Sequence, residues 1–255
     1  MCFYENPDLN KRIDCGLTVS ATQQLLDLFE KHDVKATFFI LGKVYEWYPE
    51  LIGEIAQSGH EIAFHGHTHK RIFNEYSLYE ELSMSKAFLK KFGVRGFRAP
   101  GMYLPDSCFK VLSGNGFKYD SSIYSAVGKP IDLGSLIEVP VSTYPLTCKA
   151  SNVGSPRPSF KAVGDFEIPF GSGLFVAVLS LRLLNALINS FNLMGRSAVM
   201  FIHPWQLIVD KINTSKSLRE YFLKFPYKIR IKKEKLEALL RQHSFTTVNE
   251  LIKEL

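Results

Sequence analysis

With 255 residues, the chain can bury one substantial core, and because single α/β barrels reach this length we expect one domain over residues 1–255. Apolar residues make up 46% of the chain and charged residues 22%, a balance that excludes disordered, collagen-like and fully membrane-embedded proteins. The net charge of +6 favours anionic partners such as phosphorylated sugar carriers, acidic glycans, nucleic acid or a lipid surface, without choosing among them.

Helical and extended patterns alternate along the chain. In order, the sequence predicts a helix between Ser20 and His32, a strand at residues 35–41, a helix at 49–58, a strand at 60–65, a helix at 77–92, a strand at 96–98, a helix at 105–114, a strand at 136–141, a helix at 174–190 and a strand at 198–203. Ser77-Leu78-Tyr79-Glu80 has the form of a capping box. Residues 151–165 lack periodicity and predict a loop, which we interpret as a cover over the site. The alternation predicts βαβ units and a parallel sheet, open or closed.

Polar side chains at the carboxyl ends of the predicted strands mark the candidate site, because α/β barrels assemble their sites on that rim. His65, Arg98 and His203 all fall there. The strongest local signal is His65, His67 and His69, at alternate positions where a strand runs into a turn, so that two or three imidazoles can converge on a divalent cation. The alternative is a set of surface histidines that bind no metal, and three histidines in five residues make it the poorer interpretation.

The residues around these histidines resemble the second motif of the polysaccharide deacetylase (NodB homology) family. In that motif G-H-E-I precedes a strand ending in H-[ST]-x-x-[HS] or H-G-[YF]-[ST]-H, and the matching residues here are Gly59-His60-Glu61-Ile62, His65 and His69. Further segments resemble the family in order: V-K-A-T-F-F-I-L-G at residues 34–42, R-A-P at 98–100, Y-D-S-S at 119–122 and F-I-H-P-W at 201–205. E-V-P at 138–140 and G-S-G at 171–173 resemble the branch associated with exopolysaccharide or lipopolysaccharide biosynthesis. The resemblance implies a distorted (β/α) barrel of the NodB type.

The resemblance also implies a zinc-dependent hydrolase that removes an N-acetyl group from an amino sugar in a polysaccharide or its precursor. In the family, two histidines and an aspartate hold the metal and a neighbouring aspartate is the base. His65 and His69 are therefore expected to bind the metal, and His203 to be the general acid. Arg98 is expected to position the base, and Asp120 to help hold the acid. Each of the last three residues has a structural alternative. His203 could be a packed histidine at a strand end, Arg98 a surface ion-pair partner, and Asp120 part of a turn or a helix cap.

The chain departs from the family at the first motif, a strand carrying T-F-D-D or D-x-E that supplies the base and the third metal ligand. No such strand precedes the helix after Ser20. Asp14-Cys15-Gly16 superficially resembles D-D-G, and a Cys15 thiolate could replace an aspartate on zinc, but Lys11-Arg12-Ile13 is a poor buried strand. We therefore expect a barrel without its first strand, from a chain that starts just downstream of the motif, with an unpaired sheet edge.

Two other functions stay open: a catalytically inactive glycan-binding module of the same fold, and a deformylase or another amidohydrolase on it. The expected partner is an amino-sugar-containing or lipid-linked glycan, and no nucleic-acid motif is present in the sequence. The basic residues 228–233 could meet a membrane surface, although a solvated face is the simpler interpretation. Residues 206–255 are expected to form a C-terminal helical extension.

The sequence shows neither a signal-peptide pattern nor an apolar stretch long enough to span a bilayer, because residues 174–188 are too few and include Arg182. The cysteines are widely spaced, with no C-x-x-C pair: Cys2, Cys15, Cys108 and Cys148. We interpret them as structural thiols in a reducing compartment, and expect a cytoplasmic protein. The sequence does not predict the oligomeric state.

Overall fold

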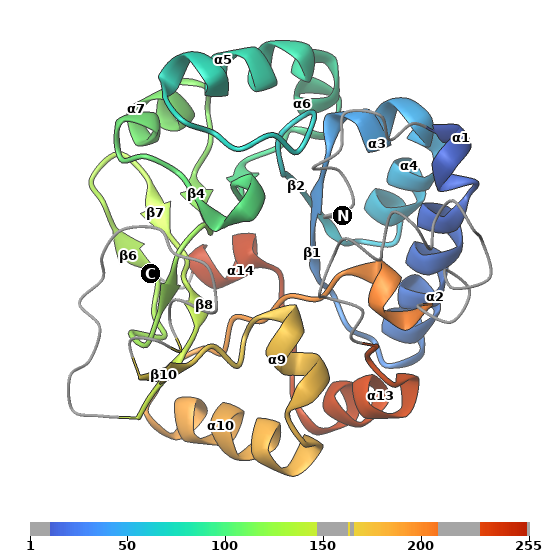
Figure 1. Ribbon diagram of the computed structural model, residues 1–255, viewed down its shortest axis with the longest axis vertical. Helices are drawn as coiled ribbons and strands as arrows, with labels where there is room; N and C mark the ends of the chain where they lie inside the picture. Colours follow the sequence, from blue (N-terminus) through green and yellow to red (C-terminus); the bar gives the residue numbers. More distant parts are fainter. Residues whose placement is uncertain (1–10, 147–162, 164–165, 209–229, 254–255) are drawn as a thin grey trace.

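A six-stranded sheet forms the centre of the protein in the computed structural model, which describes residues 11–146, 163, 166–208 and 230–253 (Figure 1). Its strands, in spatial order, are β1 (Thr37–Ile40), β2 (Glu61–Phe64), β3 (Gly96–Phe97), β4 (Tyr119–Asp120), β7 (Ile137–Glu138) and β6 (Ile131–Asp132). The first five are parallel and β6 is antiparallel to β7. Because parallel strands end on the same side of a sheet, the residues that follow β1, β2, β3 and β4 meet on one rim.

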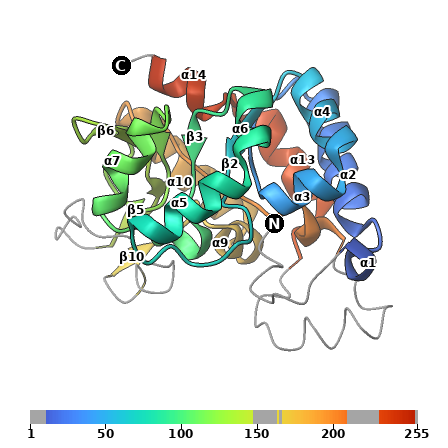
Figure 2. The same cartoon turned by 90° about the horizontal axis from the view of Figure 1, so that it is seen from above.

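Helices join the parallel strands in βαβ order. Before β1 come α1 (Lys11–Asp14) and α2 (Leu17–Lys31); between β1 and β2 lie α3 (Gly42–Trp47) and α4 (Pro49–Gln57); between β2 and β3 lie α5 (Glu75–Met84) and α6 (Lys86–Phe92); between β3 and β4 lie the 3-10 turn η1 (Pro100–Met102) and α7 (Ser107–Gly114). Figures 1 and 2 show α1 to α4 gathered on one side of the molecule, with α7 and β6 on the opposite side. This arrangement confirms the predicted α/β fold with a parallel sheet.

The C-terminal half adds two small sheets and further helices. Strand β5 (Tyr124–Ser125) pairs with β8 (Val141–Ser142), and β9 (Tyr144–Pro145) pairs with β10 (Glu167–Ile168). The helical elements that follow are α9 (Gly173–Val178), α10 (Leu181–Leu193), the 3-10 turn η2 (Pro204–Leu207), α13 (Lys233–Gln242) and α14 (Val248–Lys253). Helices α13 and α14 lie within residues 206–255, of which 209–229 and 254–255 are outside the described residues, and the C-terminal helical extension stays a prediction. Because β4 and β7 pair, the central sheet is shared by both halves of the chain.

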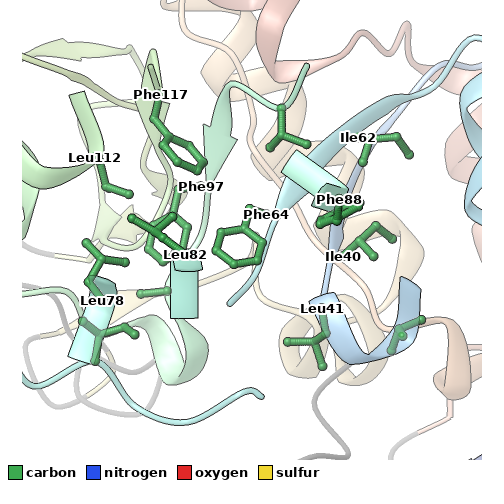
Figure 3. Close-up of a cluster of buried hydrophobic side chains, with 14 of the residues drawn as sticks. Ile40, Leu41, Ile62, Phe64, Leu78, Leu82, Phe88, Phe97, Leu112 and Phe117 are labelled. Carbon is green, nitrogen blue, oxygen red and sulfur yellow. The ribbon is translucent and has the colours of Figure 1, made fainter. Parts of the chain in front are cut away.

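The main core lies between the sheet and the helices that connect its strands (Figure 3). Phe64 of β2 is fully buried, and its ring centroid lies 5.8 Å from that of Phe97 and 6.3 Å from those of Phe88 and Phe117. A buried aromatic side chain of this kind contributes about 1.5–3 kcal/mol. Packing on this scale holds the ends of β2 and β3 in place, and with them His65 and Arg98.

Two of the predicted helices are each divided into two shorter helices in the structure. The helix expected at 77–92 is divided at Ser85 into α5 and α6, and it also begins earlier than expected. The helix expected at 77–92 starts at Glu75, and its capping box pairs Asn74 with Ser77 instead of Ser77 with Glu80. Asn74 Oδ1 accepts from Ser77 N, so Asn74 is the N-cap residue of α5, the role that the sequence had assigned to Ser77. The helix expected at 174–190 divides into α9 and α10, because Ser180 is extended and its hydroxyl caps α10 by accepting from Leu183 N.

The strand expected at 198–203 does not form; these residues belong to no sheet, although they run extended beside the C-terminal half. Ser142 N donates to Val199 O at 3.0 Å, and Phe201 N donates to Gly171 O at 2.8 Å. Gly171 is required for this approach, since a Cβ there would collide with Val199 O. Among the described residues these backbone bonds join the segment to the C-terminal half, and no continuous ladder develops there. The strand expected at 136–141 is likewise split into β7 and β8, with Val139-Pro140 between them.

Several other predictions concern local features. In the described part of the chain, no helix is long and apolar enough to cross a membrane. The described cysteines, Cys15 and Cys108, form no disulfide. Cys2, Cys148, most of the loop at 151–165 and residues 228–229 of the basic segment lie outside the described residues. In the basic segment 228–233, Ile231 is buried in the same apolar cluster as residues of α2, so only part of this segment can form a solvated face.

Candidate active site

The carboxyl ends of β2 and β3 bring His65 and Arg98 together. His65 follows β2 directly, and its backbone N–H donates to Ile40 O of β1. Its Nδ1 lies 2.7 Å from Arg98 O, where a protonated Nδ1 donates and leaves Nε2 available as a ligand. Arg98 N in turn donates to Phe64 O. Hydrogen bonds between main chain and ring therefore fix the direction in which His65 points.

His69 lies beside His65, with ring centroids 5.0 Å apart and the rings edge to face. His69 is 3% exposed, and neither of its ring nitrogens has a hydrogen-bond partner among the residues that the structure describes. Its backbone has φ 62, a left-handed conformation that costs energy for a residue with a Cβ. Burying an imidazole without a hydrogen-bond partner, on a left-handed backbone, costs free energy of folding unless its nitrogen binds a ligand.

Burial keeps both histidines neutral. It lowers the pKa of His65 well below its usual value, and the nearby His69 lowers it further. Burial also lowers the pKa of His69, to about 3. Metal coordination requires the neutral imidazole, so the environment favours the form that can bind a cation.

His67, the middle histidine, points away from this pair. Its Nδ1 lies 3.0 Å from Ser85 Oγ, and its Nε2 lies 3.7 Å from Glu46 Oε1. A Cβ on Gly42 would collide with both His67 and Ser85, so the glycine at the start of α3 is what allows this close packing. His67 is therefore part of the structural support of the loop.

Glu81 of α5 holds the turn that carries the histidines. Its carboxylate accepts from the backbone N–H groups of His67 and Thr68 and from the Thr68 hydroxyl. The Glu81 side chain is 4% exposed. Sequence reasoning did not identify Glu81, because its place opposite the turn follows from the packing of α5 and has no signal in the motif.

Arg98 reaches from β3 into the gap between β1 and the segment 198–203. Its guanidinium carbon lies 4.2 Å from the ring centroid of Phe39 and 5.3 Å from that of Phe201. Nε donates to Ser121 O and Nη2 donates to Ser121 Oγ, at 2.8 and 2.6 Å. Arg98 is 6% exposed, so the surface ion-pair alternative does not describe it. Ser121, from the Y-D-S-S segment, is the residue that fixes this cation.

Asp120 is fully buried and lies next to Glu138 on the adjacent strand, where the register places the two residues opposite each other. Asp120 Oδ1 accepts from Ser122 Oγ, and Glu138 Oε1 accepts from Ser122 N and Ile123 N. Burial raises the pKa of both carboxyls, and the Asp120 charge raises that of Glu138 further. Asp120 Oδ2 and Glu138 Oε2 have no hydrogen-bond partner among the described residues, and we interpret the pair as sharing one proton between these oxygens.

His203 ends the extended segment and enters the site from the C-terminal half. Its ring stacks on Trp205 at 5.7 Å and lies edge-on to Phe201 at 5.5 Å. Its backbone N–H donates to Gln206 Oε1, and Gln206 Nε2 donates to Gly173 O, which ties the G-S-G segment to the site. Burial lowers the pKa of His203 well below its usual value.

One cavity of about 450 Å³ connects these groups, and His65, Arg98 and His203 all contribute to its wall. The structure therefore brings His65, His69, Arg98 and His203 together and places Asp120 one layer behind them. In the residues that the structure describes, no group of three His, Cys, Asp or Glu side chains could hold a metal ion. Two histidines fit a metal, but a catalytic zinc site has three protein ligands, so the described set falls one short.

The Asp14-Cys15 alternative does not complete the set. The Asp14 carboxylate accepts from the backbone N–H of Thr18, from its hydroxyl and from Tyr48 Oη, and so caps the start of α2. Cys15 is exposed. These residues stabilise the first turn of the helix and are engaged there.

The sequence and the fold match known proteins. Residues 12–119 match the family model described as polysaccharide deacetylase, and residues 121–253 match one described as a domain of unknown function (DUF3473). A peptidoglycan-N-acetylglucosamine deacetylase of Bacillus cereus is 31% identical over 109 residues, which cover 41% of this chain and 51% of that protein. The chain thus spans about half the length of this relative.

Solved structures show the same fold over nearly the whole chain. A protein from Mycobacterium smegmatis described as a putative polysaccharide deacetylase superposes with a TM-score of 0.56 at 23% identity, covering 92% of this chain and 82% of that one. A family 4 carbohydrate esterase pseudoenzyme from Bacillus anthracis superposes with a TM-score of 0.50 at 13% identity, covering 92% and 61%. At these identities the likeness establishes the distorted barrel fold alone.

Proposed function

Because this chain belongs to the polysaccharide deacetylase family, with residues 121–253 matching a domain of unknown function, we propose that it removes the N-acetyl group from an amino sugar in a polysaccharide or its precursor. The observation that carries the proposal is the pair of buried, neutral histidines, His65 and His69, beside the buried Arg98 and the half-buried His203. The named relative acts on a peptidoglycan N-acetylglucosamine, and the proposed substrate class extends that chemistry to this chain.

Zinc is the cofactor that we propose for His65 and His69, with the described residues supplying two of its ligands. When bound, such an ion polarises an amide carbonyl and lowers the pKa of water. His65 would bind through Nε2, because Nδ1 is held by Arg98 O. His69 could bind through either nitrogen, since neither has a hydrogen-bond partner in the described part of the chain.

The remaining site residues handle charge and protons. His203 is neutral and faces the same cavity, so its ring can take up a proton and release it to the amine that leaves. Arg98, held by Ser121, places a fixed positive charge where a carboxylate base or a developing oxyanion would be stabilised. Asp120 and Glu138 are assigned to holding this region in place, one layer behind the reacting groups.

Acetate release from chitooligosaccharides and from peptidoglycan fragments tests the proposal. We expect release that zinc supports and a chelator abolishes, and that is lost in His65→Ala and His203→Ala. The matched control is His32→Ala, which removes the histidine at the end of α2, outside the lining of this cavity. Release that is unchanged in His65→Ala and His203→Ala would contradict the assignment, as would no release from either substrate.

An inactive glycan-binding module is the second candidate, favoured by the incomplete ligand set of the described residues. The pseudoenzyme of similar fold shows that the architecture persists in proteins so named. Binding of chitooligosaccharides without acetate release, at any zinc concentration, would favour this candidate over the enzyme.

A further inference from the structure

A second cavity, of about 540 Å³, lies at the end of the sheet opposite the candidate site, and we call it the basic groove. Its wall includes residues 93–95, which precede β3, and residues 115–118, which precede β4. The rest of its lining comes from α5 and α6. The candidate site lies at the carboxyl ends of the strands, where His65 and Arg98 follow β2 and β3, so the groove at the amino ends is a separate place on the molecule.

Four cationic side chains line the basic groove, and no acidic side chain of the described residues does: Lys86, Lys90, Arg95 and Lys118. All four residues are exposed. Within the part of the chain that the structure describes, none of the four forms an ion pair with a carboxylate. The groove therefore concentrates positive charge that the described residues do not neutralise.

The four cations form two pairs of neighbours with like charge. Lys86 and Lys90 are four residues apart on α6, so they adjoin on one face of the helix. Arg95 and Lys118 adjoin across two strands, because Lys118 N donates to Arg95 O at 2.7 Å and the residues that follow them are paired in β3 and β4. Like charges at either spacing repel and destabilise the fold. An anion bound in the groove would replace both repulsions by attraction.

The dipole of α6 does not account for the lysine pair. A cation near the carboxyl end of a helix is favourable, and Lys90 lies in the last turn of α6. Lys86 is the first residue of the same helix, where the dipole opposes a positive charge. Lys91 shares the last turn, but its Nζ lies 5.5 Å from the ring centroid of Tyr45, outside the groove. The pair that faces the groove is thus not explained by the stability of the helix.

The floor of the basic groove is apolar. Leu82, Val94 and Phe117 line the groove and are buried, so they lie beneath the exposed cations. Leu82 and Phe117 belong to the main core and are labelled in Figure 3. The hydroxyl-bearing residues Tyr79 and Ser83 add polar groups to the wall. Cations above an apolar floor suit a ligand that joins anionic groups to an apolar or sugar body.

Two phosphate groups match the charge of the groove. A phosphate ester carries a charge of about −1.5 to −2 at neutral pH, so each pair of cations balances one phosphate. The Arg95 guanidinium can hold phosphate oxygens through two parallel hydrogen bonds, and the lysines act as point charges. A carboxylate carries a single charge, so each cation would need a carboxylate of its own, spread along a longer ligand. Two linked phosphates fit the volume of about 540 Å³ better.

We propose that the basic groove binds the diphosphate group of a phosphorylated ligand, with one phosphate on the lysine pair of α6 and the other on Arg95 and Lys118. The apolar floor then contacts the body of the ligand. A soluble nucleoside diphosphate and a lipid diphosphate share this chemistry, and the test below separates them. The inference does not rest on the proposed function, because the groove shares no lining residue with the cavity of the candidate site.

Isothermal titration calorimetry of the 255-residue protein at physiological salt tests the proposal. The probes are inorganic pyrophosphate, inorganic phosphate, uridine diphosphate and farnesyl diphosphate. A chelator is present throughout, so that no probe can bind through a metal ion held by His65 and His69.

Two double variants each remove one pair of cations: Lys86→Gln with Lys90→Gln, and Arg95→Gln with Lys118→Gln. The matched control is Lys110→Gln with Lys129→Gln, which removes the same charge at exposed positions outside the groove. The melting temperature of each protein without ligand is measured as well, because a purely structural role of the cations would appear there.

We expect pyrophosphate to bind one per chain, about tenfold or more tighter than inorganic phosphate. Each groove variant should weaken pyrophosphate binding about tenfold or more, whereas the control variant should stay within about twofold of the wild type. Without ligand, the groove variants should melt no lower than the control, since each loses a repulsion. One ester should bind more tightly than pyrophosphate: uridine diphosphate if the ligand is soluble, and farnesyl diphosphate if it is a lipid.

No binding of pyrophosphate, or equal binding by the wild type and both groove variants, would overturn the proposal. Groove variants that melt below the control would also overturn it, because the cations would then serve the fold. Esters that bind no more tightly than pyrophosphate would overturn the role of the apolar floor. Oligogalacturonate that binds more tightly than pyrophosphate would overturn the diphosphate, because the groove would then recognise carboxylates along a glycan.

Discussion

Replacing Glu138 by glutamine should remove a pH-dependent loss of stability that the Asp120–Glu138 pair imposes on the fold. Both carboxyls are buried, and they face each other across adjacent strands with one shared proton. In Glu138→Gln the side-chain amide donates to Asp120 without needing that proton. Its oxygen can still accept from Ser122 N and Ile123 N, as Glu138 does.

The magnitude follows from the pKa of Asp120. Burial raises this pKa from 3.8 to about 6, a difference that corresponds to about 3 kcal/mol. The folded state therefore binds the proton more tightly than the unfolded state. The free energy of unfolding is retained in full below pH 3.8 and falls as the pH rises through the raised pKa values. A loss of about 3 kcal/mol is a large part of the 5–15 kcal/mol typical of a domain.

Urea denaturation of the wild type and Glu138→Gln between pH 5 and pH 8 measures this effect. The stability of the variant relative to the wild type should increase by about 1.4 kcal/mol per pH unit, because the folded wild type keeps a Glu138 proton that the unfolded chain has already lost. Glu54→Gln, at an exposed position of α4, is the matched control and should follow the wild type. A difference between Glu138→Gln and the wild type that does not change with pH would refute the shared proton.

Two further variants test the packing that supports the site. Gly42→Ala should lower the free energy of unfolding by about 1–3 kcal/mol, because the added Cβ would collide with His67 and Ser85. Its control is Gly53→Ala on α4, whose added Cβ would meet no atom within 4 Å and which should be neutral or stabilising. Equal effects of the two variants on the free energy of unfolding would show that the contact of Gly42 is unimportant. Lys235→Met should cost about 1–2 kcal/mol, because Lys235 Nζ donates to three carbonyls at the end of α9, those of Val176, Ala177 and Leu179. Lys233→Met, at an exposed position of the same helix, is its control in thermal unfolding, and matching melting temperatures would contradict this role.

The order of the elements and most of the site were predictable from local patterns. The apolar run before Leu41, the histidines after β2 and the Arg98 segment each carry their signal within a few residues. Their positions at the ends of parallel strands follow from the βαβ alternation, which the structure confirms. Whether each side chain takes the role assigned to it stays a prediction.

The parts that could not be predicted depend on contacts between distant residues. The different orientation of His67 arises because Gly42 lets it pack on Ser85, 18 residues away, and nothing within the H-G-H-T-H segment encodes this. The Asp120–Glu138 pair likewise requires the register of β4 with β7. Residues 198–203 have the composition of a strand, but in the described part of the chain they make only isolated backbone bonds with the C-terminal half, so the apolar pattern alone could not predict the outcome.

The amount of zinc bound per chain tests the central claim most directly. We predict that the wild type binds zinc, that His65→Ala loses this zinc, and that His67→Gln, which alters the histidine held by Ser85, keeps it. If His65→Ala retains as much zinc as the wild type, or if His67→Gln loses it as fully as His65→Ala, then the metal is not held where this account places it.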